Sequence, residues 1–539
     1  MNRSYLGEIL VENGLIDRNM LDYALSVSHT TGARLGDTLE RLGLVTDREI
    51  AQAIAHQTGA PFADLAEASH VEALRLIPLN FAQKHLVLPL GVENGRLRLA
   101  CEDPKNPQLP GLIARFVAQP IDLAVAPRTA LGREIQRRYY RAEHSLDEEV
   151  NKIGQAAAAG RDFSADRLAE LIVGAAIEAQ ASDIHVSPTP LASIVSLRMD
   201  GVMQTRFTMP IAAHARLVSA VKVMAALDIA DANRAQDGRI AFKYLDERHD
   251  LRVATMPNVN GENLVIRLLA SGGENLWSLQ HLGYRPAQIA QIERLTRRAH
   301  GAVLVSGPTG SGKTTTLYAM LRRIDMLTRN VLTVEDPVEI RLPLARQMEV
   351  NERAGITFAS ALRAFLRQDP DVILVGEVRD AETAQLTLRA AQTGHMVLST
   401  VHTNDAVGAI VRLRDLSCQD AVISSALNGI VAQRLVRRLC PHCRAQIEAP
   451  ESLREHLGVA TVFARVGCPQ CRGTGYIGRQ AVAEIVEFDA ELRGMVEHGA
   501  LPTEIEASVR ARGILSLRDA ALTLVAEGVT DLAEVERAV

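Results

Sequence analysis

The feature that most constrains the fold is a glycine-rich loop that stands between an apolar segment and a helical one. Residues 307–314 read GPTGSGKT and satisfy the phosphate-loop pattern G-x-x-x-x-G-K-[ST]. The loop follows the strand-like segment AVLVS and leads into TTTLYAMLRRI, which reads as a helix. A strand, this loop and a helix in that order predict a nucleoside triphosphate site, and the strand–helix alternation up to about residue 430 predicts a largely parallel, helix-covered sheet.

The chemistry of a phosphate loop gives each of its residues a role. Backbone N–H groups and the helix N-terminus attract phosphates, Lys313 reaches the β- and γ-oxygens, and the Thr314 hydroxyl can ligate magnesium. The residues predicted to bind the nucleotide are Gly307, Pro308, Thr309, Gly310, Ser311, Gly312, Lys313, Thr314 and Thr315.

The segment RQDPDVILVGEVRD (367–380) is a charged stretch around an apolar centre, Val372 to Val375, which stops at Gly376 and Glu377. A core strand that leaves its sheet through a solvated turn would give this pattern. A phosphate-loop enzyme, however, needs an acidic residue at the end of a neighbouring strand to hold the metal directly or through water. Glu377 is therefore the leading candidate for that role.

Two more apolar segments end in polar residues. NVLTVEDPVEI ends in the carboxylates Glu335, Asp336 and Glu339, which could supply the base for water, with an acidic turn in solvent as the alternative. MVLSTVHTN ends in His402, which by itself could be an ordinary core or surface histidine. Because strands of an α/β sheet present ligand-binding residues beyond their carboxyl ends, we expect all of these side chains near the phosphates.

Size and composition bound the rest of the chain. Its 539 residues are too many for one core, and this length suggests roughly three or four domains. No apolar run approaches the ~18–20 residues of a membrane span, and no signal peptide is recognisable, so we expect a cytoplasmic protein. The net charge of −5 gives no case for nucleic-acid binding, which disfavours a nucleic-acid translocase.

Four of the six cysteines form two close pairs, Cys440 with Cys443 and Cys468 with Cys471. Two thiolates two residues apart can bind one ion, and two such pairs complete a tetrahedral zinc site with no open position. In a cytoplasmic chain such pairs favour a metal over a disulfide. We therefore expect a structural zinc site, with reduced thiols as the alternative.

The first sixty residues contain an internal repeat. YLGEILVENGLIDRNMLDYALSVS (5–28) aligns without gaps with RLGDTLERLGLVTDREIAQAIAHQ (34–57). Each copy predicts a short helix closed by a glycine, followed by a second helix capped by Asp17 in the first copy and by Thr46 in the second.

Four ordered motifs carry a resemblance to a known family. GPTGSGKTTTL, TVEDPVE, RQDPDVILVGEVRD and TGHMVLSTVHTN resemble the Walker A, Asp box, Walker B and His box of the GspE/PilB-type secretion ATPases, which power type II secretion and type IV pilus assembly. ASDIHVSP, RMDG and QDGRI match the domain that precedes the core in this family. The resemblance implies the following roles: Lys313 and Thr314 on phosphates and magnesium, Glu377 as Walker B acid, Glu339 as general base, His402 as γ-phosphate contact, and Arg252 and Arg267 as arginines that stabilise the transferring phosphoryl group.

The repeat resembles the MshE-type N-terminal domain, in which two motifs of the form RLGxxLxxxGxxxxxxLxxxLxxQ bind cyclic di-GMP. The first copy has Tyr5 and Ser28 where the motif has arginine and glutamine, and losing the guanidinium fork should weaken binding. A cyclic di-GMP receptor in which hydrolysis is secondary is the alternative function, and a repeat that only packs helices or docks a partner is the alternative for this segment. The second copy keeps Arg34, Leu35, Gly36, Leu39, Gly43 and Gln57.

The resemblances imply an α/β multidomain protein with a RecA-like ATPase core, and a homo-hexamer that uses ATP, Mg²⁺ and Zn²⁺. They imply peripheral association with the inner membrane, on its cytoplasmic face, through the platform and cytoplasmic-domain proteins of a secretion or pilus machine, without nucleic acid. The expected divisions are an MshE-type helical repeat domain (1–60), a small α/β domain (61–140), a linker (141–165), a PAS-like domain (166–278), the ATPase core (279–435), a tetracysteine zinc module (436–480) and a C-terminal helical region (481–539).

Overall fold

The computed structural model describes residues 5–65, 71–268 and 278–539. It divides into two compact units, Met1–Glu274 and Asn275–Val539, and each is described by itself. The end of the predicted 166–278 domain, residues 269–277, lies outside the described residues.

The N-terminal repeat folds as its sequence predicts, as two copies of a short helix, a glycine at positive φ and a longer helix. Asp17 accepts a hydrogen bond from the Met20 N–H at 2.9 Å, and Thr46 forms a capping box with Glu49, so both predicted caps are confirmed. Apolar residues from both copies share one core. The helices are α1 (Leu6–Glu12), α2 (Arg18–Thr31), α3 (Leu35–Arg41) and α4 (Asp47–Thr58).

A small α/β region follows, with a three-stranded sheet in the order β1-β2-β3. The carboxylate of Asp47, on α4, accepts hydrogen bonds from the backbone N–H groups of Arg128 and Thr129, each at 2.8 Å, and so ties the repeat to the start of the last helix. Burial raises the pKa of Asp47. The elements are α5 (Val71–Leu74), α6 (Leu79–His85), β1 (Val87–Glu93), β2 (Arg96–Cys101), α7 (Leu109–Ile113), β3 (Ile121–Val125) and α8 (Arg128–Glu143).

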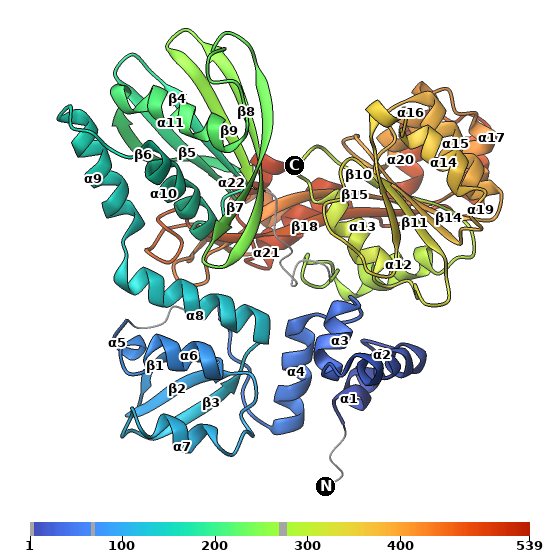
Figure 1. The fold of residues 1–539 in the computed structure, drawn as a ribbon. Coiled ribbons are helices and arrows are strands. Elements are labelled where there is room, and N and C mark those ends of the chain that lie inside the picture. Colours follow the sequence, from blue (N-terminus) through green and yellow to red (C-terminus); the bar gives the residue numbers. More distant parts are fainter. Residues whose placement is uncertain (1–4, 66–70, 269–277) are drawn as a thin grey trace. The chain divides into compact units, whose positions relative to one another are not determined.

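The rest of the first unit is a six-stranded antiparallel sheet in the order β6-β5-β4-β9-β8-β7, with its apolar face packed against helices (Figure 1). Its elements are α9 (Leu146–Ala158), α10 (Ala165–Glu178), β4 (Asp183–Pro188), β5 (Ala192–Met199), β6 (Val202–Pro210), α11 (Ile211–Met224), β7 (Gln236–Tyr244), β8 (Glu247–Asn258) and β9 (Gly261–Leu268).

Segment 141–165, expected as a linker, instead contains helix α9. Val150 is buried, and Leu146 and Ile153 pack against the core of the six-stranded sheet. These three residues recur at helical spacing within the charged segment LDEEVNKI. The segment therefore does have the apolar stripe of an amphipathic helix, but the charged residues between its members make it read as a linker.

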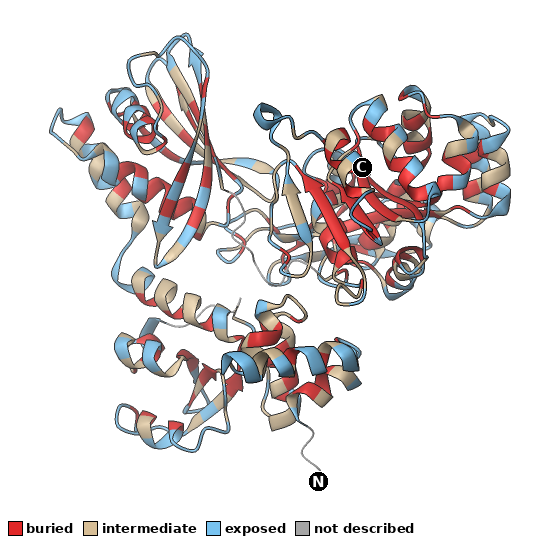
Figure 2. Ribbon diagram, turned by 45° about the vertical axis from the view of Figure 1, so that its right-hand side comes forward, coloured by how far each residue is buried: buried red, intermediate tan, exposed pale blue. Residues whose placement is uncertain are grey.

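The second unit is built on a seven-stranded sheet in the order β12-β11-β13-β14-β10-β15-β18, in which the neighbours from β12 to β15 are parallel. Helices α12 and α13 pack on one face and α14 to α17 on the other, so the central strands are buried on both faces (Figure 2). This explains the unbroken apolar run Val372–Val375. The strands are β10 (Gly301–Ser306), β11 (Val331–Glu335), β12 (Arg346–Glu349), β13 (Val372–Val375), β14 (Met396–Val401), β15 (Leu427–Leu439) and β18 (Tyr476–Glu487), and the helices are α12 (Pro286–Thr296), α13 (Lys313–Leu321), η1 (Glu352–Ala354), α14 (Phe358–Phe365), α15 (Ala381–Gln392), α16 (Ala406–Asp415) and α17 (Asp420–Ala426).

The sheet runs beyond residue 435, where the ATPase core was expected to end, because β15 and β18 form a long antiparallel pair. The cysteine module lies between these two strands, and the C-terminal helices share the core of the sheet. Within the described residues, no helix combines the length and hydropathy needed to cross a membrane. The remaining elements are β16 (Ala445–Glu448), α18 (Glu451–Leu457), β17 (Thr461–Ala464), α19 (Ala490–Glu497), α20 (Pro502–Ala511), α21 (Leu517–Ala526) and α22 (Leu532–Ala538).

Candidate active site

The phosphate loop joins β10 to α13 and depends on its glycines. Gly310 and Gly312 have φ values of 81° and 85°, a region that residues with a side chain seldom adopt. A Cβ on Gly307 would lie 2.4 Å from Ser311 Oγ and 2.6 Å from the Gln433 carbonyl oxygen. The backbone can therefore curl into the concave shape that aims N–H groups at an anion.

Lys313 is the first residue of α13, and its ammonium folds back onto its own loop. Nζ donates to the carbonyl oxygens of Gly307 at 2.8 Å and Pro308 at 3.1 Å. Burial, with a smaller contribution from Arg434, lowers the pKa of Lys313 to about 8 against the opposing effect of Glu377. A phosphate would offer this ammonium stronger acceptors than the two carbonyls.

The ends of the central strands meet beside the loop. The Gly307 N–H donates to the Val401 carbonyl at 3.3 Å, and the Gly376 N–H donates to the Val334 carbonyl at 2.8 Å. A Cβ on Gly376 would lie 3.3 Å from Glu335 Cα, so glycine allows the chain after β13 to pass close to β11. The carboxyl ends of β10, β14, β13 and β11 thus form one edge of the sheet.

Glu377 and His402, predicted from separate motifs, are in contact at this edge. His402 Nε2 lies 3.3 Å from Glu377 Oε2, and Arg379 donates to the other carboxylate oxygen at 2.5 Å. Arg379 also lies 3.9 Å from Asp336. The sequence alone assigned no role to Arg379, because it lies among several charged residues of segment 367–380 and no pattern there indicates which carboxylate it contacts.

The structure separates the three carboxylates that follow β11. Glu335 is buried and accepts hydrogen bonds from the hydroxyls of Tyr318 and Thr333. Asp336 and Glu339 are exposed in the loop after the strand. Of the three carboxylates, only that of Glu335 is buried and hydrogen-bonded in the interior, whereas those of Glu339 and Asp336 are accessible to water.

Two residues that were not predicted from the sequence, Gln433 and Tyr284, form hydrogen bonds that hold the phosphate loop in place. Gln433, on β15, donates to the Ser311 carbonyl at 2.6 Å and accepts from the Tyr284 hydroxyl at 2.7 Å. Both side chains are buried, and burial raises the pKa of Tyr284. They come from segments far apart in sequence, and no local pattern marks either one.

The two arginines expected to act on the nucleotide lie in the first unit. Arg252 and Arg267 are direct cross-strand partners on β8 and β9. Arg267 Nε donates to Asp183 at 2.9 Å, whereas the buried Nε of Arg252 has no partner in the described part of the chain.

The four paired cysteines converge, with their sulfur atoms all within 4.8 Å of one another. Cys440 and Cys468 Sγ lie 3.8 Å apart, as do Cys443 and Cys471 Sγ. Four sulfurs at ~2.3 Å from one zinc ion in a tetrahedron would be about 3.8 Å apart. Although burial opposes ionisation, N–H groups of Cys468 and Gly475 lower the pKa of the Cys471 thiol to about 6. The spacing of the four sulfur atoms fits a tetrathiolate metal site, and the pKa shifts of the thiols are mixed, because burial raises the pKa of Cys440 to about 12 and also raises that of Cys443.

A pocket of about 690 Å³ lies against the N-terminal repeat, and the two copies line it with equivalent residues. Tyr5, Gly7 and Leu21 of the first copy correspond to Arg34, Gly36 and Ile50 of the second. Among the residues predicted for cyclic di-GMP, those that line the pocket are Arg34, Leu35, Gly36 and Gln57, whereas Leu39 is in the core and Gly43 closes a helix.

The two arginines of this pocket are already paired with carboxylates, whereas Lys105, which also lines it, donates to the Gln57 carbonyl at 3.0 Å. Arg34 lies 3.0 Å from Glu102, and Arg128 lies 3.2 Å from Asp37 and 3.5 Å from Glu102. In the first copy, Ser28 does not replace the missing glutamine, because its hydroxyl donates to the Ala33 carbonyl at 2.6 Å.

A phosphate loop with acidic and imidazole side chains at the carboxyl edge of a parallel sheet defines an α/β ATPase. A family profile described as Type II/IV secretion system protein matches residues 159–537, and one described as MshEN domain matches residues 58–145. The chain belongs to the Type II/IV secretion system protein family. The MshEN match falls on the small α/β region that follows the repeat.

Named relatives represent two kinds of machine. The type IV pilus assembly ATPase PilB of Thermus thermophilus is 38% identical, over 99% of this chain and 66% of that longer protein. The type II secretion system protein E of Pseudomonas aeruginosa is 39% identical, over 89% of this chain and 98% of the relative. Among solved structures, the ATPase DotB of Legionella pneumophila superposes with a TM-score of 0.51 at 20% identity, covering 68% of this chain and 94% of DotB, and supports the fold alone.

Proposed function

We propose that this chain hydrolyses ATP to drive either type II secretion or type IV pilus assembly. The observation that carries the proposal is the gathering of Lys313, Glu377 and His402, from three separate motifs, at one edge of the parallel sheet. Relatives that match most of this chain carry the names of both machines, which supports the motor and leaves the choice of machine to experiment.

In the proposed mechanism, the phosphate loop holds the triphosphate and Lys313 neutralises its β- and γ-oxygens. The oxygen of a water attacks the γ-phosphorus, the bond from that phosphorus to the bridging oxygen breaks, and Glu339 takes the proton of the water. ADP leaves with the bridging oxygen, and inorganic phosphate carries the oxygen of the water. His402, next to Glu377, is assigned to the γ-phosphate.

Two metals belong to the proposal. The Thr314 hydroxyl and the Glu377 carboxylate offer the oxygen ligands that Mg²⁺ prefers, and Mg²⁺ would offset charge on the phosphates when bound. The four cysteines would hold Zn²⁺ in a structural role, because all four ligand positions are taken by protein. Assembly as a homo-hexamer, docking to inner-membrane platform proteins, and the action of Arg252 and Arg267 on the phosphoryl group stay predictions from the resemblance.

The test is phosphate release by the purified full chain with Mg²⁺ and ATP. We expect steady turnover that Lys313→Ala and Glu339→Gln each reduce at least a hundredfold, and turnover unchanged in both would contradict the mechanism. The machine is identified by complementation: the chain is expressed in one host that lacks its type II secretion ATPase and in another that lacks its pilus-assembly ATPase. Restored secretion or restored piliation decides between them.

The repeat pocket favours a second candidate function, binding of cyclic di-GMP. The supporting observation is that equivalent residues of two repeat copies line one cavity, a shape suited to a ligand with two equivalent halves. Calorimetric titration of cyclic di-GMP into the full chain tests it, with linear pGpG as the control ligand. No heat at high micromolar ligand, or equal heat from pGpG, would remove this candidate.

A further inference from the structure

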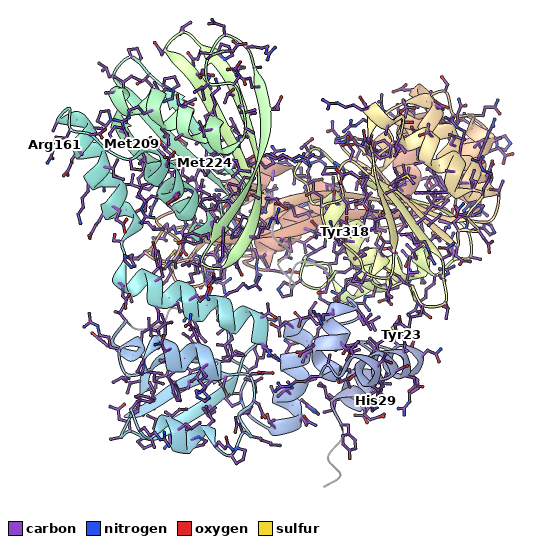
Figure 3. All side chains as sticks on the ribbon, in the orientation of Figure 1. Tyr23, His29, Arg161, Met209, Met224 and Tyr318 are labelled. Atoms are coloured by element: carbon purple, nitrogen blue, oxygen red, sulfur yellow. The ribbon has the colours of Figure 1, made fainter. Side chains whose placement is uncertain are left out.

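A buried hydrogen-bond network joins the phosphate-loop helix to the loop that carries Glu339. Its centre is Glu335, which is 3% exposed at the end of β11. Glu335 accepts hydrogen bonds from the hydroxyl of Tyr318 at 2.5 Å and from the side-chain amide of Gln347 at 3.1 Å. Tyr318, labelled in Figure 3, lies on α13, the helix that begins at Lys313.

The same side chains hold the backbone that follows Glu339. The Ile340 N–H donates to the Tyr318 hydroxyl at 3.4 Å, and Gln347 donates to the Ile340 carbonyl at 2.9 Å. Gln347 also accepts from the Leu342 N–H at 2.6 Å. The backbone of residue 340 is therefore held by both side chains and that of residue 342 by Gln347, while Glu339 itself remains exposed.

We propose that Tyr318, Glu335 and Gln347 are positioning residues that set the place of the Glu339 carboxylate according to the place of the phosphate-loop helix. This inference rests on the proposed function, in which Glu339 is the base for water. Tyr318 follows Lys313 by five residues on the same helix, so any shift of α13 on phosphate binding would move the Tyr318 hydroxyl. That hydroxyl contacts both Glu335 and the backbone next to Glu339, which makes it the link between nucleotide occupancy and the base.

A role in stability alone and a positioning role predict different kinetics. A merely structural contact lowers the melting temperature and the amount of folded enzyme but leaves the kcat of the folded fraction unchanged. A positioning contact lowers kcat with little effect on nucleotide affinity, because a base displaced by ~1 Å costs up to about a hundredfold in rate.

The first experiment uses Tyr318→Phe in the full chain, which removes one oxygen atom and keeps the ring. We expect kcat for ATP to fall about tenfold, while KM and the Kd of a fluorescent ADP analogue stay within about twofold. The matched control is Tyr476→Phe, which removes another buried hydroxyl that donates to a carboxylate, that of Asp531 at 2.7 Å, within the same unit. The control is expected to lower stability and to keep kcat. Gln347→Met provides a second, partly exposed position and is expected to lower kcat likewise.

The second experiment combines Tyr318→Phe with Glu339→Gln. If the tyrosine acts through the glutamate, the double variant has the residual turnover of Glu339→Gln alone. A further tenfold loss in the double variant, or a kcat that neither Tyr318→Phe nor Gln347→Met changes, overturns the inference and leaves the proposed function intact. Wild-type turnover in Glu339→Gln overturns the assignment of the base and the inference with it, so the two failures are distinguishable.

Discussion

Lys313 at the catalytic edge and two arginines of the repeat pocket are cations suited to an anionic ligand, but they differ in the groups that they already contact. Lys313 rests on two carbonyl oxygens of its own loop. Arg34 and Arg128 are paired with carboxylates of Glu102 and Asp37. A phosphate is a stronger acceptor than a carbonyl, so it readily replaces the carbonyls as the partner of the Lys313 ammonium. At Arg34 and Arg128 a phosphate must compete with carboxylates, which are negatively charged like itself.

The different surroundings of these cations also determine how large an effect each substitution should have. Lys313 is buried, so its interactions are screened little by water, and losing it should be severe. The Arg34 side chain is 70% exposed, and an exposed ion pair is worth only about 0–1 kcal/mol, so competition from Glu102 weakens a ligand a few-fold. We therefore expect the residues of the motif to matter strongly for nucleotide turnover at the edge, and we expect the pocket to bind its ligand more weakly than the motif alone would suggest.

The largest effect is expected from Lys313→Ala, which removes the one cation that the phosphate loop itself supplies. Turnover should fall about a thousandfold, because a buried charge at the developing phosphate charge is lost. The measurement is phosphate release, with the exposed surface variant Lys243→Ala as the control. Since the pocket belongs to another part of the chain, binding of cyclic di-GMP should be unchanged in Lys313→Ala. A loss of both turnover and cyclic di-GMP binding would mean that the catalytic edge and the pocket do not act as separate sites.

His402→Gln should have the next largest effect. We expect kcat to fall on the order of tenfold to a hundredfold, the value of one hydrogen bond to a charged group. The chain offers a matched control, because His395 precedes the same strand that His402 follows, and His395→Gln removes an imidazole from its opposite end. Equal losses in both variants would assign His402 to the support of β14 and not to the nucleotide.

Much of the catalytic edge could be predicted from the sequence, because the parallel arrangement of the strands determines where the residues that follow them lie. Once the strands are recognised, their carboxyl ends must share an edge, and Glu377 meets His402 although 25 residues separate them. Gln433, Tyr284 and the buried role of Glu335 could not be predicted, because they depend on which side chains face each other across a packed interior. Glu102, in a different part of the fold from Arg34, escapes a motif search for the same reason.

At the pocket, Tyr5→Arg should strengthen cyclic di-GMP binding about tenfold, by restoring the charged fork of the first copy. Tyr5 and Arg34 are the N-cap residues of α1 and α3 and have nearly identical backbone angles, φ −68° and ψ 153° against φ −66° and ψ 147°. Tyr5 is also 82% exposed, so the substitution leaves the core alone. Calorimetry measures the change, and Tyr5→Phe serves as the control. No gain in affinity would show that the pocket does not use its two copies equivalently.

The smallest effect is expected from Glu102→Gln, which removes the competing carboxylate and keeps the shape of the side chain. Affinity for cyclic di-GMP should rise about threefold, the scale of one exposed ion pair. The control is Glu93→Gln, whose carboxylate pairs with Arg98 at 2.6 Å on the neighbouring strand and does not line the pocket. Salt separates the two possible causes of a gain. If Glu102 competes for Arg34, the advantage of Glu102→Gln over wild type shrinks as ionic strength rises, because the pair it removes is already screened. An advantage that does not change with salt would mean that the glutamine contacts the ligand directly, and Glu102 would then not be the group that weakens ligand binding at Arg34.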